Sequence, residues 1–179
     1  MADISPSIDT RRIQRNPIRI LALDGGGARG LSSLILLRGL MERVAVARDT
    51  STHQPVIVRP SDYFDLIIGA GTGGICALFL GGLRMTVDEA ICAYQEVANA
   101  AFQAPNSLSR ISLLPLSRAL QPALLSQQME QCVSSIVQRH LQDRDAAFAE
   151  PVEGSHTCRT AVLAGTTAYI NAPPYILRS

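Results

Sequence analysis

Short apolar runs alternate along this chain with longer stretches in which apolar residues recur every three or four positions. Each short run predicts a strand, and the strands are expected at residues 18–23, 64–68, 159–164 and 175–178. Each longer repeat predicts a helix, and the helices are expected at residues 31–46, 75–83, 87–102 and 122–141. Because strands and helices alternate, the pattern predicts an α/β fold with a mostly parallel sheet.

Polar stretches divide these elements. Residues 1–16 are predicted to be a disordered lead, and residues 17–179 to form the folded domain. Residues 103–120 are expected to be irregular and residues 143–156 to form a polar loop. Residues 49–60 are expected to form a loop, in which residues 56–58 are compatible with a short strand. Thr86 and Glu89 stand three positions apart, the spacing of a capping box that starts a helix.

The last predicted helix carries one apolar face. That face consists of Leu125, Met129, Cys132, Val133, Ile136, Val137 and His140.

Composition excludes several classes of function. The formal net charge of the 179 residues is +1, which gives no electrostatic basis for binding nucleic acid. The first 15 residues lack the apolar core of a secretory signal, and no apolar run is long enough to cross a bilayer. We therefore expect a soluble, cytoplasmic protein.

Neither a metal nor a cofactor is indicated. The four cysteines form no C-x-x-C pair, and Cys76, Cys92 and Cys132 fall in predicted helices, where small core positions are expected. The histidines, His53, His140 and His156, are scattered, and His140 is expected on or beside an apolar helix face. The carboxylates of Asp143 and Asp145 are expected to be solvated.

Two glycine-rich loops carry the functional signal. The first glycine loop, residues 24–30, reads D-G-G-G-A-R-G, and the second glycine loop, residues 69–74, reads G-A-G-T-G-G. Each follows a predicted strand and leads into a predicted helix. Backbone N–H groups at such a helix start can bind a phosphate or a developing oxyanion.

A dinucleotide site is the first alternative, since both loops fit G-x-G-x-x-G. Asp24 would repel a pyrophosphate bound at the first loop. Neither loop is followed, about 20 residues on, by a strand that ends in an acidic residue. Asp49 has nearly that spacing but follows a helical stretch.

The two loops, in this order, resemble those of the patatin-like phospholipase family, whose motifs are D-G-G-G-x-[RK]-G and G-x-S-x-G. The resemblance extends over residues 18–179 and includes the stretch before the second loop and the R-M-T-V-D-E sequence at 84–89, which is similar to fungal members. It implies a three-layer sandwich that is incomplete at its C-terminus.

The resemblance also implies roles for the loop residues. The loop of Gly25, Gly26, Gly27, Arg29 and Gly30 corresponds to the oxyanion hole, with the first three glycines supplying N–H groups. Arg29 would either fix the shape of the loop or be a solvated charge.

Gly69, Gly71 and Gly73 correspond to the nucleophile elbow, and Gly71 stands where the family has its serine. Thr72 is expected to point away from the first loop and not to replace the nucleophile. The aspartate of the Ser–Asp dyad, within a D-G-[GA] motif, is expected beyond Ser179.

Two functions follow from the resemblance. One is a lipid acyl hydrolase, a phospholipase or esterase with lipid or ester substrates, that is inactive as it stands. The other is a non-catalytic binding or regulatory module of a longer protein with further domains after Ser179. Because further strands are expected beyond Ser179, we also expect exposed apolar surface.

Overall fold

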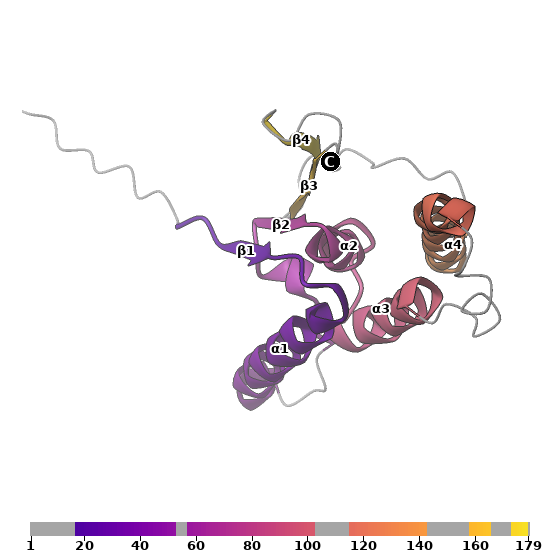
Figure 1. The fold of residues 1–179 in the computed structure, drawn as a ribbon. Helices are drawn as coiled ribbons and strands as arrows, with labels where there is room; N and C mark the ends of the chain where they lie inside the picture. Colours follow the sequence, from indigo (N-terminus) through magenta and orange to yellow (C-terminus); the bar gives the residue numbers. More distant parts are fainter. Residues whose placement is uncertain (1–16, 53–56, 103–114, 143–157, 166–172, 179) are drawn as a thin grey trace, which may run out of the picture.

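The structure is a computed structural model that describes residues 17–52, 57–102, 115–142, 158–165 and 173–178. Its sheet has the order β1-β2-β3-β4, and its strands are β1 (Ile20–Leu23), β2 (Leu66–Ala70), β3 (Arg159–Ala164) and β4 (Tyr175–Arg178) (Figure 1). The first three strands run parallel, and β4 runs antiparallel to β3. The predicted α/β class with a mostly parallel sheet is confirmed.

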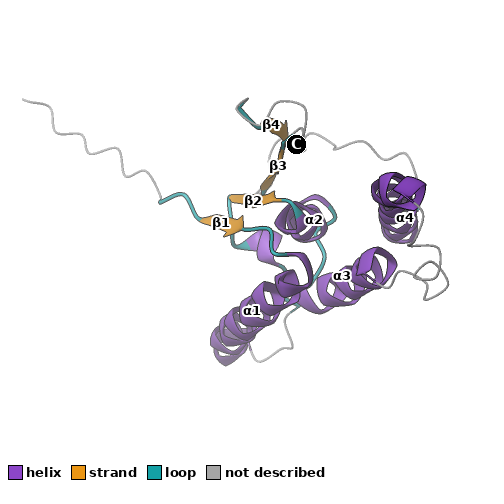
Figure 2. Cartoon of the chain, viewed as in Figure 1, coloured by secondary structure: helices purple, strands orange, loops and turns teal. Residues whose placement is uncertain are grey.

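Four α-helices accompany the sheet in the described part of the chain (Figure 2). They are α1 (Gly30–Thr52), α2 (Thr72–Ala77), α3 (Val87–Phe102) and α4 (Pro115–Leu141). A π-helical turn, Leu78–Gly82, continues α2, and 3₁₀ turns cover Gly27–Arg29 and Pro60–Asp62. α3 packs against α1 and against α4, and α2 lies against the sheet (Figure 1).

The predicted elements exist, but several of their boundaries were wrong. β2 ends at Ala70, two residues later than expected, because Gly69 pairs with both neighbouring strands. α1 continues to Thr52, six residues past the predicted end. α4 starts at Pro115 instead of Pro122, since a proline at the first helical position lacks only an N–H that would have no partner there.

Other expectations concern segments that are only partly described. Residues 57 and 58 are not in a strand, and residue 56 lies outside the described residues. The predicted lead at 1–16 and the polar loop at 143–156 also lie outside them.

One apolar core joins the sheet to the helices. Its largest apolar side chains that are less than 2 % exposed are Leu34, Ile67, Phe79, Leu80 and Ile136. Burying a side chain of this size is worth about 1.5–3 kcal/mol. The same core also contains buried residues of β1, α2 and α3. It therefore fixes the strands and helices that flank both glycine loops relative to one another.

The predicted apolar face of α4 packs on this core through its described residues. Ile136 is fully buried, and Met129, Cys132, Val133 and Val137 are partly buried. His140 lies beside that face, and its Nε2 donates a hydrogen bond to the carbonyl oxygen of Leu83 at 2.8 Å. This contact joins the end of α4 to the turn after α2.

The expectation for the helical cysteines was wrong at one position. Cys76 is buried and Cys132 is half-buried, but Cys92 is exposed on α3. The buried side of α3 is formed by Ala90, Ala93, Tyr94 and Val97. Position 92 lies outside that three- and four-residue spacing and so faces solvent.

Candidate functional site

The two glycine loops lie next to each other at the carboxyl ends of neighbouring parallel strands. Leu23, at the end of β1, pairs with Gly69 in β2. A Cβ atom on Gly25 would lie 3.0 Å from the carbonyl oxygen of Ala70 and 3.6 Å from Cα of Gly71. The backbones of the two loops thus approach each other closely at the edge where α/β sheets bind ligands.

The apex of the second loop has a backbone conformation that favours glycine. Gly71 is exposed and has φ 57° and ψ −127°, directly between the end of β2 and the first residue of α2. A residue with a Cβ is strained in this region by about 1–3 kcal/mol. A Cβ at Gly71 would nevertheless have room, since it would meet Cα of Gly25 at 3.7 Å. The apex therefore has space for a side chain and lacks one.

Two positions after Gly71, the second loop requires a glycine for steric reasons. Gly73 is buried in the first turn of α2, and a Cβ on it would overlap the carbonyl oxygen of Leu23. This close approach sets α2 directly against the end of β1. The distance between the two loops therefore depends on Gly73.

Thr72 does not point away from the first loop, so that expectation was wrong. Its Oγ1 accepts a hydrogen bond from the backbone N–H of Gly26 at 3.1 Å. Thr72 is the first residue of α2, and the positive φ of Gly71 turns the chain so that this side chain reaches the neighbouring loop. One of the three expected oxyanion donors is therefore already bonded within the protein.

Further contacts of the first loop involve Arg29 and Tyr94. The backbone N–H of Arg29 donates to the carbonyl oxygen of Gly26 at 3.2 Å, and Nε of Arg29 lies 3.4 Å from the same oxygen. The hydroxyl of Tyr94, on α3, donates to the carbonyl oxygen of Gly27. Arg29 is an exposed side chain that contacts the loop, and Tyr94 is a functional candidate that the sequence analysis missed.

Ionisable groups near the loops are not arranged as nucleophiles. Cys76 is buried in α2, and burial raises the pKa of its thiol to about 12. At neutral pH this thiol stays protonated and is a poor nucleophile. Burial likewise raises the pKa of the Tyr94 phenol, which therefore remains a donor.

The other candidates from the sequence lie away from the loops or outside the described residues. His140 contacts Leu83, and His53, His156, Asp143 and Asp145 are not described. Among the residues that the structure describes, no group of three or more His, Cys, Asp or Glu residues could hold a metal ion. In the same part of the chain, no helix is long and apolar enough to cross a membrane.

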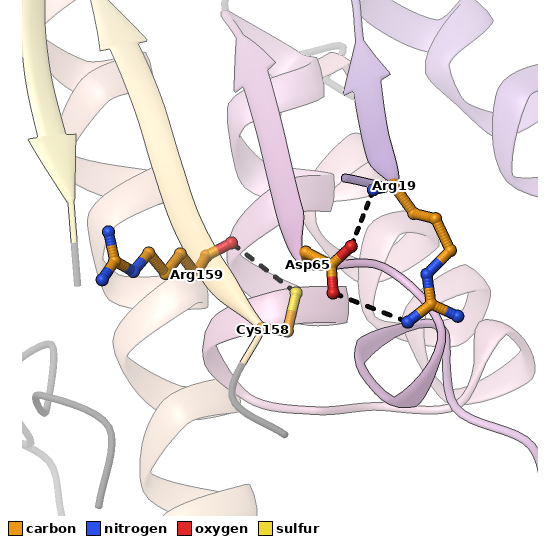
Figure 3. A network of polar contacts seen from close by, with 4 residues as sticks. All are labelled: Arg19, Asp65, Cys158 and Arg159. Atoms are coloured by element: carbon orange, nitrogen blue, oxygen red, sulfur yellow. Dashed lines mark hydrogen bonds and ion pairs between the residues drawn. The ribbon is translucent and has the colours of Figure 1, made fainter. Parts of the chain in front are cut away.

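A polar network lies at the opposite, amino end of the strands (Figure 3). Asp65 accepts from the backbone N–H of Arg19 at 2.7 Å, and its carbonyl oxygen accepts from the backbone N–H of Arg159 at 2.9 Å. Cys158 is buried there, and burial raises the pKa of its thiol to about 11. The network joins the starts of three strands and contains no exposed nucleophile.

Comparison with known proteins gives partial matches to phospholipases. The chain is 39% identical to calcium-independent phospholipase A2-gamma of Rattus norvegicus over 85 residues, which is 48% of this chain and 9% of that protein. It is 30% identical to phospholipase A I of Arabidopsis thaliana over 96 residues, 54% of this chain and 6% of that protein. It is 39% identical to patatin-like protein 4 of Arabidopsis thaliana over 66 residues, 36% of this chain and 15% of that protein.

These matches support a patatin-like phospholipase relationship over part of the chain, and the chain spans less than a fifth of each of these relatives. No family model matches the chain. No solved structure matches it either.

Proposed function

We propose that this chain contains part of a patatin-like lipid acyl hydrolase domain that has lost catalysis and binds a lipid ester or its anionic product at the two glycine loops. The observation that supports this most directly is the adjacency of Gly25 and Gly71, whose backbones approach each other at the carboxyl edge of the sheet. In a hydrolase of this kind, one loop would hold the oxyanion and the other would carry the nucleophile.

Because Gly71 has no side chain, the proposed site lacks the hydroxyl nucleophile of the Ser–Asp dyad. In a serine hydrolase the hydroxyl attacks the ester carbonyl, and loss of the nucleophile lowers turnover by about 10⁶. Backbone donors alone leave a residual rate about 10³ above water, which is too slow to sustain a metabolic step. Binding is the capacity that these loops would retain.

The sequence also offers no second member of the dyad in the expected motif. The one Asp–Gly pair in these 179 residues is Asp24–Gly25, which belongs to the first loop. Thr72 has a hydroxyl near the site, but its oxygen accepts from the N–H of Gly26. Its role in this proposal is to hold the loop.

A non-catalytic module within a longer protein is compatible with the same binding site. The relatives that match are much longer than the matched stretch, which is therefore only a part of each of those chains. Loss of the nucleophile would then leave lipid recognition as the retained activity. The dinucleotide alternative has weaker support, because Thr72 already occupies one N–H of the first loop.

The test combines turnover and binding on the purified chain. We expect no hydrolysis of p-nitrophenyl butyrate above background, and no gain with Gly71→Ser alone, because a serine without a base is a weak nucleophile. Turnover by the wild-type chain that disappears in Thr72→Ala would overturn the inactive assignment and make Thr72 the nucleophile.

Binding is measured by calorimetry with octylphosphonate, a stable anion that carries an alkyl chain. Octanol and inorganic phosphate are the controls for the chain and for the anion. Saturable binding of octylphosphonate, shifted by Gly71→Val through steric filling of the site, is the expected result. Equal heats for octylphosphonate and octanol would contradict an anion site at the loops.

A further inference from the structure

Tyr94 connects helix α3 to the first glycine loop. Tyr94 is 2 % exposed, and its hydroxyl donates a hydrogen bond to the carbonyl oxygen of Gly27. Burial raises the pKa of this phenol, so it remains a neutral donor across the physiological range. The ring is packed in the core that also contains Leu34 and Val97. A rigid side chain of the scaffold therefore bonds directly to the candidate site.

Three consecutive peptide groups of the loop are each held by a different partner. The N–H of Gly26 donates to Thr72 Oγ1 at 3.1 Å. The carbonyl oxygen of Gly26 accepts from the backbone N–H of Arg29 at 3.2 Å. The carbonyl oxygen of Gly27 accepts from Tyr94. Each of the three peptide planes is thus held by at least one hydrogen bond.

The planarity of the peptide group turns these contacts into directions for the N–H groups. The described part of the chain has no cis peptide bond, so each carbonyl oxygen and the following N–H point in opposite directions. The N–H of Gly27 then points away from the backbone N–H of Arg29. The N–H of Ala28 points away from the Tyr94 hydroxyl. Tyr94 thereby sets the orientation of the peptide group between Gly27 and Ala28, and with it the direction of the Ala28 N–H.

Gly30 provides the space that this contact requires. A Cβ atom on Gly30 would overlap the hydroxyl of Tyr94 and lie 2.8 Å from its Cζ. Gly30 is also the first residue of α1, so the loop end and the tyrosine meet where the helix begins. The tyrosine and the glycine are therefore sterically matched.

We propose that Tyr94 is a positioning residue that orients the Gly27–Ala28 peptide, so that its N–H is a donor to an oxyanion or anionic lipid group bound at the loops. This rests on the proposed function only for the identity of the ligand. The donor set then differs from the one that the sequence motif indicates. The N–H of Gly26 is used internally, and the N–H of Ala28 takes its place.

The first test needs no ligand. Tyr94→Phe removes the hydroxyl and keeps the ring, and Tyr63→Phe is the matched control. Tyr63 is half-buried at the amino end of β2, and its hydroxyl accepts from Arg48 at 2.9 Å. In amide ¹H–¹⁵N spectra, Tyr94→Phe is expected to shift the resonances of Gly27 and Ala28, and Tyr63→Phe to leave them in place. Unchanged loop resonances in folded Tyr94→Phe would overturn the proposal.

The second test measures affinity. Octylphosphonate is expected to bind about tenfold more weakly to Tyr94→Phe, the effect of one misdirected hydrogen bond, and with wild-type affinity to Tyr63→Phe. Absence of binding to the wild-type chain would contradict the proposed function and leave the spectral test of Tyr94 standing. If Tyr94→Phe does not fold, Gly30→Ala tests the same contact from the other side, because its Cβ displaces the phenol. It should shift the same two resonances, and unshifted resonances would reject the role of Tyr94.

Discussion

Arg19 and Asp65 are joined by hydrogen bonds in both directions. The N–H of Arg19 donates to Oδ2 of Asp65 at 2.7 Å (Figure 3). The N–H of Asp65 donates to the carbonyl oxygen of Arg19 at 2.8 Å. The guanidinium of Arg19 lies 3.5 Å from Oδ1 of the same carboxylate. Asp65 therefore supplies the side chain that aligns the start of β1 with β2, at the opposite end from the glycine loops.

Replacement of Asp65 by alanine is expected to lower the free energy of unfolding by about 1–2 kcal/mol. A hydrogen bond to a charged group contributes about 1.5–3 kcal/mol, and partial exposure of this carboxylate reduces that figure. Asp65→Asn keeps an acceptor oxygen and should cost less. Urea denaturation measures both. The control is Asp62→Ala, which removes an exposed ion pair with Arg84, and an equal loss of stability there would contradict the role of the Asp65 hydrogen bond.

Stability should depend on pH through Glu89. The backbone N–H of Thr86 donates to the Glu89 carboxylate at 2.8 Å, and this hydrogen bond holds the pKa of Glu89 below its ordinary value of 4.5. Because the folded pKa is the lower one, the stabilisation is complete above pH 4.5 and is lost as the pH falls through the folded pKa.

The variant for this test is Glu89→Gln, measured by thermal melting between pH 7 and pH 3. The wild-type chain should be the more stable at pH 7, and the difference should shrink below the ordinary glutamate pKa of about 4.3–4.5. Thr86→Ala should cost about 1 kcal/mol at pH 7, the usual value for loss of an N-cap side chain. A constant difference between wild type and Glu89→Gln at all pH values would rule out this linkage.

Two glycine-to-alanine changes should have opposite effects. Gly39 lies within α1, and a Cβ on it would meet nothing within 4 Å, so Gly39→Ala should stabilise the chain by about 0.5–1 kcal/mol. Gly73→Ala would place a methyl group on the carbonyl of Leu23 and should lower the melting temperature sharply or prevent folding. Similar melting temperatures for both variants would contradict the close packing of α2 on β1.

The cysteines should react with a thiol reagent in a fixed order. Cys92 is exposed and should be labelled fastest by 5,5′-dithiobis(2-nitrobenzoic acid) at pH 8. Cys76 and Cys158 are buried, with pKa values raised to about 12 and about 11, and should react only on unfolding. Cys92→Ser provides the control, since it should remove the fast phase. A fast phase that persists in this variant would show that a second thiol is accessible.

The juxtaposition of the glycine loops was predictable from the sequence. Parallel strands end at the same edge of a sheet, so loops that follow two neighbouring strands lie side by side. Apolar periodicity also located β3 and β4 to the residue and gave the start and the end of α3. These features depend on local pattern, and local pattern is what the sequence displays directly.

The contacts that shape the first loop were not predictable in the same way. The direction of the Thr72 side chain depends on the positive φ of Gly71, which periodicity does not encode. Tyr94 reads as one more apolar residue of the α3 core, and its hydroxyl has a role only because α3 packs beside the loop. The exposure of Cys92 could have been inferred from its offset relative to Ala93 and Val97.

The glycine at position 71 affects the resistance of the protein to degradation in a cell. Glycine removes about 1–3 kcal/mol of strain that a side chain would suffer at this turn. A chain with this residue is therefore at least as resistant to proteolytic turnover as one with serine, since degradation follows the unfolded population. Because the serine form would have the larger unfolded population, selection on abundance would favour the glycine form. Only selection for a chemical role could favour a hydroxyl at this position.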